Sequence, residues 1–341
     1  METGQERPGQ RPRPGPSWDD IGFEVLAPGM FTTVQDLGRP GWQRFGVPQG
    51  GALDAYALAA ANALVGNPPD AAGLEVTLVG PVLTVAREGL VACTGADLGF
   101  AIDGQPAALW QAHRVRPGQV LGFTGRRSGC RAYVAVAGGI AVAPVLGSRS
   151  THVRARLGGL AGRALVRGDR LPVGPLPPGW RERAGLALPP PLRRHGLPQP
   201  ARVVMGPQHD WFLPLAIERL LGATYRVSRR WDRMGLRLEG PRLAHRHSAE
   251  LVSEGVAPGS IQVPGDGQPI VLLADRQTTG GYPKIATVIA ADLDFLAQAA
   301  PGDRITFRAV DLDTAHRLRR ERQAMLAAVA RATGTAGAPG A

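Results

Sequence analysis

The chain has 341 residues, 44% of them hydrophobic and 20% charged, with 46 glycines, 31 prolines and a formal net charge of +11. This composition excludes a disordered protein, and so many Gly and Pro residues beside only 5% aromatics favour short turns over a helical bundle. No run of eighteen apolar residues occurs and the first twenty residues are polar, so we predict no membrane helix, no secretory signal and a cytoplasmic location.

Most of the positive charge lies in one segment. Residues 149–195 carry ten arginines against two acidic residues, and Trp180 is the segment's single aromatic residue. Nucleic-acid sites interleave basic residues with aromatic residues that stack on bases, and that pattern is missing here. We therefore expect no nucleic-acid partner.

Cysteine and histidine spacing argues against metal or disulfide chemistry. Cys93 and Cys130 are far apart and outside any Cys-x-x-Cys motif, which predicts two buried thiols. His245 and His247 would share one strand face, but no third ligand is near them in the sequence. We predict no metal site.

The first half of the chain reads as mainly β. Residues 1–20 form a Pro, Gly and Arg tail that is too polar to pack, and 21–175 form a first domain. Its helix is predicted to be capped by Asp54 and stopped by Gly66. Its strands are expected at 23–26, 82–85, 90–93, 120–123 and 133–137.

A Pro-rich linker at 176–200 precedes a second β domain at 201–312 and a C-terminal helix and tail at 313–341. One helix is predicted to be capped by Asp210 and to end before Gly222, and a short one to span 292–298. The terminal helix is indicated by the spacing of Leu318, Met325 and Val329. Further strands are expected at 202–205, 224–228, 270–274, 285–290 and 304–308.

Lys284 is the only lysine among the 39 basic residues. A lone lysine favours a position that needs a compact ammonium group, although chance also explains it. Its neighbours Pro283 and Ile285 exclude a Walker A loop, and no methionine flanks it as one does at a biotin attachment site. We therefore predict that ATP or biotin chemistry would come from a partner and that this chain carries no covalent biotin.

Four segments are dense in functional side chains. The first three, each with an ordinary structural explanation as well, are 32–54, 205–210 and 231–238. The fourth, 274–284, follows an apolar strand and is the strongest, and we expect Asp275 to pair with Lys284 in it. The candidate residues are Asp36, Arg39, Asp54, His209, Arg233, Asp275, Arg276, Gln277, Thr278, Gly280, Gly281 and Lys284.

Taken together, these segments resemble the carboxyltransferase-like family that includes the C subunit of prokaryotic 5-oxoprolinase, the sporulation regulator KipA and part of urea carboxylase. The resemblance covers about 23–307, although members often have Ser and Met where this chain has Gly50 and Leu53. The motifs that carry it are Thr33-Val34-Gln35-Asp36-Leu37-Gly38-Arg39, Ala61-Asn62-x-Leu64-Val65-Gly66-Asn67, Gly206-Pro207-Gln208-His209-Asp210, Asp232-Arg233-Met234-Gly235, Ser253-Glu254-Gly255 and Asp275-Arg276-Gln277-Thr278-Thr279-Gly280-Gly281-Tyr282-Pro283-Lys284.

The resemblance implies a mainly β fold with a few short helices, arranged as two cyclophilin-like β-barrel domains. It also implies a protein that works with the homologous B subunit and the A subunit of 5-oxoprolinase, using ATP shared with or bound by a partner, to open the lactam 5-oxo-L-proline to L-glutamate. Phosphate chemistry of this kind needs cations, for which Lys284, Arg276 and Arg233 are the candidates.

The resemblance also suggests a role for each remaining side chain. Asp275 would orient Lys284, Gln277 and Thr278 would donate hydrogen bonds to substrate, and Glu254 or His209 would transfer protons. The first alternative is a biotin-dependent carboxyltransferase that acts on urea or another amide. The second is a KipA-like regulatory protein that binds its homologous partner.

Overall fold

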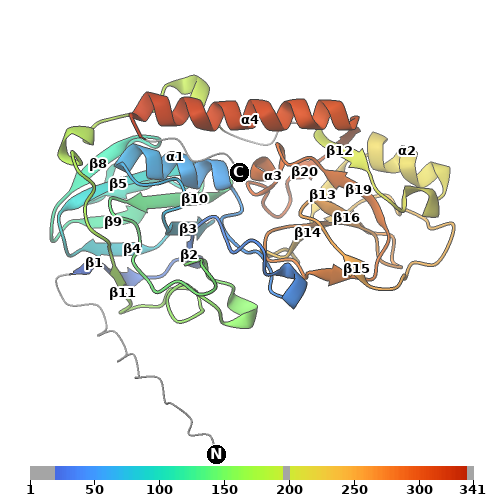
Figure 1. The fold of residues 1–341 in the computed structure, drawn as a ribbon, viewed down its shortest axis with the longest axis horizontal. Coiled ribbons are helices and arrows are strands. Elements are labelled where there is room, and N and C mark those ends of the chain that lie inside the picture. The colour runs from blue at the N-terminus through green and yellow to red at the C-terminus, as the bar shows by residue number, and fades with distance from the viewer. Residues whose placement is uncertain (1–19, 195–199, 336–341) are drawn as a thin grey trace, which may run out of the picture.

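The computed structural model describes residues 20–194 and 200–335. Two β-rich halves lie side by side, and a long helix runs across the top of both (Figure 1). The predicted tail, except Asp20, lies outside the described residues, as does part of the Pro-rich stretch. No helix in the described part of the chain is long and apolar enough to span a membrane.

The N-terminal half contains two antiparallel sheets. In the first, of order β11-β1-β4-β9-β6-β7, the strands are β1 (Ile21–Ala27), β4 (Val82–Val85), β6 (Phe100–Ile102), β7 (Gln105–Pro106), β9 (Val120–Phe123) and β11 (Arg170–Pro172). In the second, of order β2-β3-β10-β5-β8, they are β2 (Phe31–Gln35), β3 (Gly73–Thr77), β5 (Gly89–Asp97), β8 (Ala112–Val115) and β10 (Ser128–Val136).

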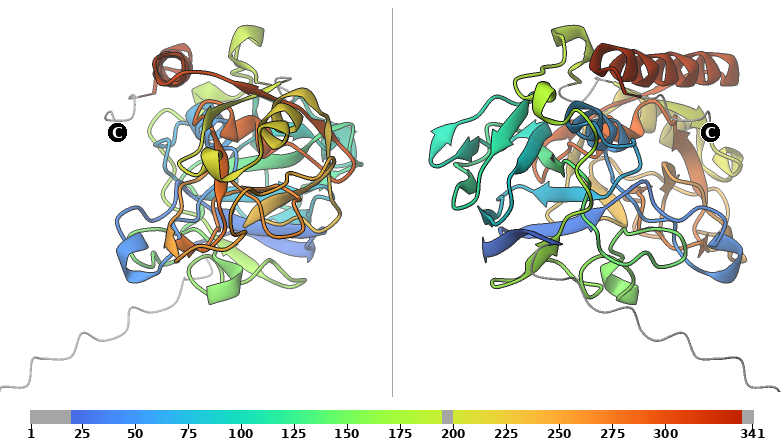
Figure 2. Two further views of the ribbon diagram at one scale, coloured as in Figure 1. Left: turned by 90° about the vertical axis from the view of Figure 1, so that its right-hand side faces the viewer. Right: turned by 60° about the vertical axis from the view of Figure 1, so that its left-hand side comes forward.

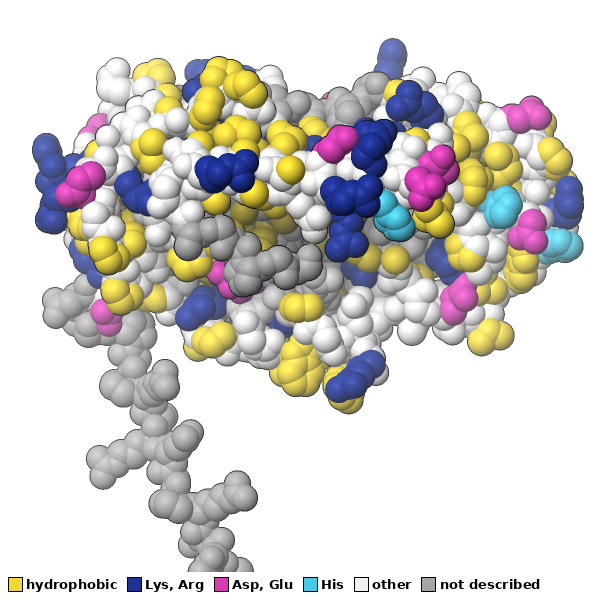
Figure 3. All heavy atoms as spheres, turned by 45° about the horizontal axis from the view of Figure 1, so that its top comes forward, with side chains coloured by type: hydrophobic (Ala, Val, Ile, Leu, Met, Phe, Trp, Pro, Cys, Tyr) yellow, Lys and Arg dark blue, Asp and Glu magenta, His cyan; other side chains and the backbone are white. Residues whose placement is uncertain are grey.

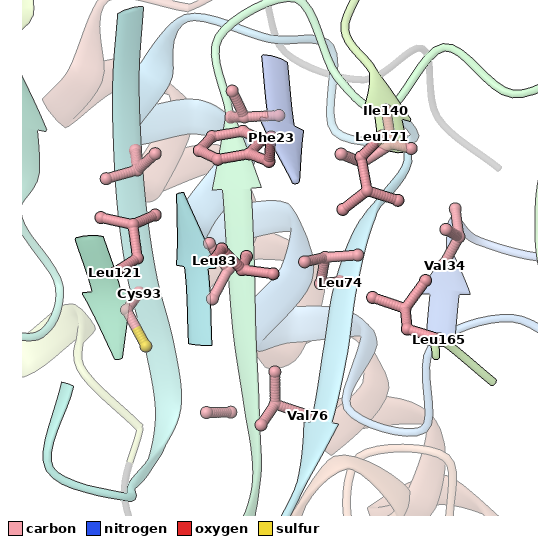
Figure 4. Packing of buried hydrophobic residues seen from close by; sticks show 14 of the residues in the cluster. Phe23, Val34, Leu74, Val76, Leu83, Cys93, Leu121, Ile140, Leu165 and Leu171 are labelled. Carbon is pink, nitrogen blue, oxygen red and sulfur yellow. The ribbon is translucent and has the colours of Figure 1, made fainter. Parts of the chain in front are cut away.

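Apolar side chains from both sheets meet in one core (Figure 4). Leu83 of β4 and Leu121 of β9 come from one sheet, and Leu74 of β3 and Cys93 of β5 from the other. In β4 the buried residues alternate with partly exposed ones, as the pleat of a half-covered strand requires. The thiols of Cys93 and Cys130 are free and buried, as predicted.

Helix α1 (Ala55–Val65) covers the other face of the second sheet, where it packs on β5 and β10. The Asp54 side chain accepts a hydrogen bond from the Ala57 amide at 2.9 Å, and Gly66 ends the helix with a φ of 83°. Both predicted helix signals are confirmed. Because α1 lies on one face and the core on the other, β5 is buried along almost its whole length.

The C-terminal half is built on one eight-stranded sheet of order β20-β13-β14-β17-β16-β19-β12-β21, beside the pair β15-β18. Its first and last strands follow each other in the sequence, so the sheet curls into a nearly closed barrel (Figure 2). The strands are β12 (Ala201–Met205), β13 (Tyr225–Val227), β14 (Gly235–Glu239), β15 (Glu254–Gly255), β16 (Ser260–Gln262), β17 (Ile270–Leu272), β18 (Thr279–Gly280), β19 (Lys284–Val288), β20 (Arg304–Ile305) and β21 (Phe307–Ala309).

Two local predictions in this half were wrong. Asp210 does not cap a helix but lies in the 3₁₀ turn η6 (His209–Trp211), because helix α2 (Pro214–Gly222) starts at a proline whose fixed φ suits the first helical position. The single strand expected at 304–308 is two, β20 and β21, on opposite edges of the sheet. The short helix α3 (Leu293–Leu296) lies within the predicted range 292–298.

Helix α4 (Leu312–Thr333) returns from the C-terminal half to the N-terminal half, where Met325, Leu326 and Val329 pack into the α1 cluster. It is longer than the short helices we expected. Acidic and basic side chains are interspersed on the face of the molecule that carries it (Figure 3). The remaining 3₁₀ turns are η2 (Gln43–Phe45), η3 (Val153–Ala155), η4 (Arg181–Arg183) and η5 (Pro190–Leu192).

The predicted mainly β fold is confirmed. The first two sheets take their strands from 21–172 and the third from 201–309. The Pro-rich stretch between them packs on the N-terminal half, since Trp180 and Leu188 are buried in the α1 cluster. We keep domain boundaries near 175 and 201 as a proposal.

Candidate active site

A glycine-rich loop of the N-terminal half, residues 36–54, reaches the C-terminal half. Its Gly50 amide donates to the Ala274 carbonyl at 3.2 Å, at the end of the β17 segment. Gly38 and Gly51 have φ angles of +88° and +90°, and a Cβ on either would lie 2.7 Å from facing backbone atoms. The tight loop therefore needs glycine at both positions.

Two predicted ligand residues instead hold this loop in place. The buried Asp36 carboxylate accepts from the hydroxyls of Ser148 (2.6 Å) and Ser150 (2.5 Å) and from the Arg149 amide (2.5 Å). Arg39, also buried, donates through Nη2 to the Ser150 carbonyl at 2.5 Å. Asp36 is therefore a positioning residue in this structure.

Arg233 joins the two halves through buried ion pairs. Its Nε and Nη2 donate to the Asp275 carboxylate at 2.9 and 3.0 Å, its Nη2 also donates to the Gly51 carbonyl at 2.5 Å, and its Nη1 pairs with Glu75 of β3. Burial would raise the pKa of Glu75, but the charges of Arg233 and Arg131 hold it below its ordinary value. Asp275 and Glu75 thus share one guanidinium across the junction.

The network continues from Glu75 to the start of α1. The Tyr133 hydroxyl donates to Glu75 at 2.8 Å and accepts from the Asp54 amide at 2.8 Å. Gln298, from the other half, donates to the Asp54 carboxylate at 2.8 Å. Burial, and then the nearby charge of Asp294, raises the pKa of Asp54 to about 7. Asp54 is enclosed by the protein rather than turned to a ligand.

Lys284 and Glu254 form the second polar centre. The Lys284 ammonium pairs with Glu254 Oε1, and the two side chains are 6% and 43% exposed. Gln208 holds the pair, because its Nε2 donates to Glu254 Oε1 at 2.7 Å and its Oε1 accepts from the Lys284 amide at 3.1 Å. The hydrogen bond from Lys284 lowers the pKa of Glu254. Glu254 is therefore an ionised carboxylate that solvent reaches.

The predicted pair of Asp275 and Lys284 does not form. Asp275 binds Arg233, and Lys284 binds Glu254. Nine residues of sequence suggested direct neighbours, but β16 lies between β17 and β19 in the sheet. Two strand spacings, about 10 Å, separate the strands that carry the two residues.

Glutamine side chains line the loop between β17 and β19. Gln277 donates to the Gln262 side-chain oxygen at 3.3 Å, and Gln262 donates to the Tyr282 carbonyl at 3.3 Å. A Cβ at Gly280 would lie 2.6 Å from Gln262 Nε2, so glycine at this position leaves room for the amide. The structure thus brings Gln277 and Gly280 together, as expected of one site.

Three other predicted ligands of this loop are tied to the backbone. Arg276 is buried and donates to the carbonyls of Val256 (3.1 Å) and Leu273 (3.4 Å). The carbonyls of Thr278 and Gly281 accept from the amides of Val256 (3.1 Å) and Leu251 (2.9 Å). These bonds pack the loop against 251–256, the segment that presents Glu254.

His209 lies on the surface near this centre in the sequence. Its Nδ1 is 2.8 Å from the Gly206 carbonyl, and because a carbonyl only accepts, Nδ1 carries the hydrogen and Nε2 is the basic nitrogen. His245 bonds to the Val263 carbonyl at 2.9 Å, and His247 packs edge-on against Trp211. The described residues contain no cluster of His, Cys, Asp and Glu able to hold a metal ion.

Sequence reasoning missed several polar residues of these networks: Glu75, Arg131, Tyr133, Gln208 as an orienting group, Gln262 and Gln298. Glu75 had a readable signal, since it is a single charge in the apolar strand Leu74 to Val76. Gln298 had none, because only the folded chain brings it to Asp54.

Two kinds of comparison place the chain among known proteins. A family model described as carboxyltransferase domain, subdomain A and B, matches residues 45–309. The C subunit of 5-oxoprolinase from Escherichia coli (strain K12) is 40% identical over 303 residues, which are 88% of this chain and 95% of that protein. The protein of the same name from Haemophilus influenzae is 38% identical, over 89% of this chain and 96% of that protein.

A solved structure gives the same relationship. The K. lactis urea amidolyase matches with a TM-score of 0.84 and 31% identity. The match covers 91% of this chain but 20% of that much longer chain. The present chain thus corresponds in fold to one part of a multidomain protein.

Proposed function

The chain belongs to the family of carboxyltransferase domains made of subdomains A and B, and on that premise we propose that it is the C subunit of an ATP-dependent 5-oxoprolinase, which converts 5-oxo-L-proline to L-glutamate. The observation that carries the proposal is the 40% identity to a protein of that name over 95% of its length. The family also contains urea-acting relatives, so the choice of substrate needs chemistry as well as similarity.

Those relatives are named as one component of a larger assembly. We propose that this chain works with a homologous B subunit and with the A subunit, and that ATP is bound by a partner or shared with it. The single lysine of the chain is already in an ion pair with Glu254, which supports a chain without covalent biotin.

Opening the lactam adds water across the ring C–N bond, so the carbonyl carbon gains a hydroxyl and the nitrogen gains a proton. Negative charge develops on the lactam oxygen, or on a phosphate carried by it, as the water attacks. The Lys284 ammonium is buried and fixed by Glu254 and Gln208, which makes it a preorganised cation for that charge.

Glu254 and His209 supply the proton transfer in this scheme. One oxygen of Glu254 is engaged by Lys284 and Gln208, and its lowered pKa keeps the group ionised, so it accepts a proton from the attacking water. His209 Nε2 is a second proton acceptor, on the residue that follows Gln208 in the chain. Gln277, with Gly280 beside it, would donate to the substrate.

A second candidate is a carboxyltransferase acting on urea or another amide. The TM-score of 0.84 with K. lactis urea amidolyase favours it, together with the family description. In that reaction Lys284 would polarise a carboxybiotin brought by a partner. The same cation thus fits both reactions, and only the substrate separates them.

The test is release of glutamate from 5-oxo-L-proline by this chain mixed with ATP and the products of the adjacent genes. A parallel tube holds urea, bicarbonate and a biotin carrier. We expect ATP-dependent glutamate formation that stops when this chain is omitted. Carboxylation in the parallel tube without glutamate would overturn the oxoprolinase proposal, and silence in both with a stable complex to the B subunit would favour a regulatory protein.

A further inference from the structure

A cavity of about 410 Å³ lies between the two halves, away from the Lys284–Glu254 pair. Its volume is within the range of small-molecule sites. The N-terminal half lines it with residues that include Arg131 and Arg154, and the C-terminal half with residues that include Arg229, Trp231 and Arg233. Nothing in the reaction derived from Lys284 uses this space.

The buried end of the cavity is positive but partly neutralised. Arg233 is paired with Asp275 and Glu75. Arg131 packs its guanidinium 4.7 Å from the centre of the Trp231 ring, and its Nε lies 3.8 Å from Glu75 without a hydrogen bond. These contacts fix the end of the cavity and keep it rigid.

The open end carries positive charge that no described carboxylate neutralises. Arg154 and Arg229 are both exposed, and neither has an ion-pair partner among the described residues. The acidic residue beside them, Asp232, is engaged, because its Oδ1 accepts from the amides of Met234 (2.8 Å) and Gly235 (3.2 Å).

The walls between the two ends are largely apolar. Phe31, Val153, Trp231 and Met234 line them. A charged rim over apolar walls suits a ligand that carries an anionic group on a small hydrocarbon frame. Guanidinium groups recognise carboxylate and phosphate through paired N–H donors, whereas an uncharged amide offers them little.

We propose that this cavity binds a small organic anion, with its carboxylate or phosphate held by Arg154 and Arg229 and its apolar portion against Trp231. The site is independent of the Lys284 centre, and the proposed function only suggests which anions to try. 5-Oxo-L-proline and L-glutamate carry the required carboxylate, and ATP and inorganic phosphate carry the alternative group. Urea carries neither.

Calorimetric titration of the full chain tests this with 5-oxo-L-proline, L-glutamate, inorganic phosphate and ATP. 2-Pyrrolidinone, the same lactam without the carboxylate, is the matched ligand. The test variant is Arg154→Gln combined with Arg229→Gln, and the matched control is Arg230→Gln, an exposed neighbour that does not line the cavity. We expect at least one anion to bind, with Kd raised at least tenfold in the double variant and unchanged in the control.

Binding of 2-pyrrolidinone as tight as that of 5-oxo-L-proline, or anion binding that the double variant leaves unchanged, would overturn the proposal. So would the absence of binding by every anion. The reconstituted glutamate assay separates this failure from that of the proposed function. Anion binding that depends on the two arginines in a chain without oxoprolinase activity leaves the cavity site standing, whereas turnover without such binding leaves only the function.

Discussion

At the scale of single residues, Lys284 separates a catalytic cation from a structural one. Lys284→Arg keeps the charge but puts a broad, planar group where Glu254 and Gln208 enclose a compact ammonium. We expect kcat for glutamate release to fall about 10²–10³-fold, the usual cost of losing one preorganised donor. The measurement is steady-state kinetics of the reconstituted complex.

Thermal melting of the same variant supplies the control. A melting temperature within about 2 °C of the parent, together with the lost activity, assigns the effect to the site rather than to folding. Preserved activity with normal melting would contradict a special need for lysine. Glu254→Gln should also lose activity, because it removes both the carboxylate that accepts the proton and the partner that orients Lys284.

Asp54 gives a pH dependence with a defined sign. Its pKa is about 7 in the fold against 3.8 for an ordinary aspartate, so the folded protein binds this proton more tightly. The resulting stability is fully present below about pH 4 and is lost as the pH rises to 7, with a slope of at most about 1.4 kcal/mol per pH unit. The groups that face Asp54 are Asp294, Arg194 and Gln298.

Asp54→Asn keeps an oxygen for the helix cap and removes the titration. Urea unfolding at pH 5, 6, 7 and 8 measures the free energy of unfolding for both proteins. We expect the difference, parent minus variant, to fall steadily from pH 5 to 7 and then level off. Parallel curves would show that Asp54 does not titrate in this window.

At the scale of elements, the two-stranded pair β15-β18 contains its own matched test. Gly280→Ala would place a Cβ 2.6 Å from the Gln262 amide and push it away from Gln277, whereas Gly255→Ala, on the partner strand, meets nothing within 4 Å. We expect Gly280→Ala to reduce kcat/KM about tenfold, equivalent to about 1.4 kcal/mol. Gly255→Ala should retain the parent value, and equal losses in both would place the effect in the strand pair itself.

The elements also show what local sequence carries and what it does not. The cap at Asp54, the stop at Gly66 and the strands Val82–Val85 and Val120–Phe123 could be predicted, because each depends on a few neighbouring residues. The partner of Lys284 could not. It depends on β16 entering between β17 and β19, and strand order is a long-range property that no local pattern states.

The candidate residues divide in the same way. Lys284, Glu254, Gln277 and Gly280 lie together, and the lone lysine and the glycine pair had pointed to that loop. Asp36 had the same sequence appearance as a ligand, yet its oxygens are taken by Ser148 and Ser150 from more than a hundred residues away. A carboxylate in a glycine-rich loop does not reveal from sequence alone whether the chain or a ligand will satisfy it.

At the scale of the whole molecule, the halves are joined by shared burial. Leu53 of the N-terminal half belongs to the core of the C-terminal half, and α4 carries the C-terminal end of the chain back to α1. Gln298 bonds to Asp54 and to both the amide and the carbonyl of Arg131. The cavity and the loop 36–54 both lie at this junction, so its rigidity determines the shape of each.

Arg233 is the residue on which the junction most depends, since it neutralises a buried carboxylate from each half. Arg233→Ala leaves Glu75 and Asp275 buried without their partner, and we expect the free energy of unfolding to fall by about 3–5 kcal/mol. Arg237→Ala, on an exposed position of β14, is the control and should cost less than about 0.5 kcal/mol. Urea unfolding at pH 7 measures both.

The unpaired charges, rather than the lost side-chain volume, are the expected cause of that loss. Arg233→Met combined with Glu75→Gln and Asp275→Asn removes all three charges while keeping similar shapes, so it should recover at least half of the stability lost in Arg233→Ala. A triple variant as unstable as Arg233→Ala would assign the cost to packing. A loss below about 1 kcal/mol in Arg233→Ala itself would mean that the halves are held together by their apolar contacts and α4, without a contribution from the shared guanidinium.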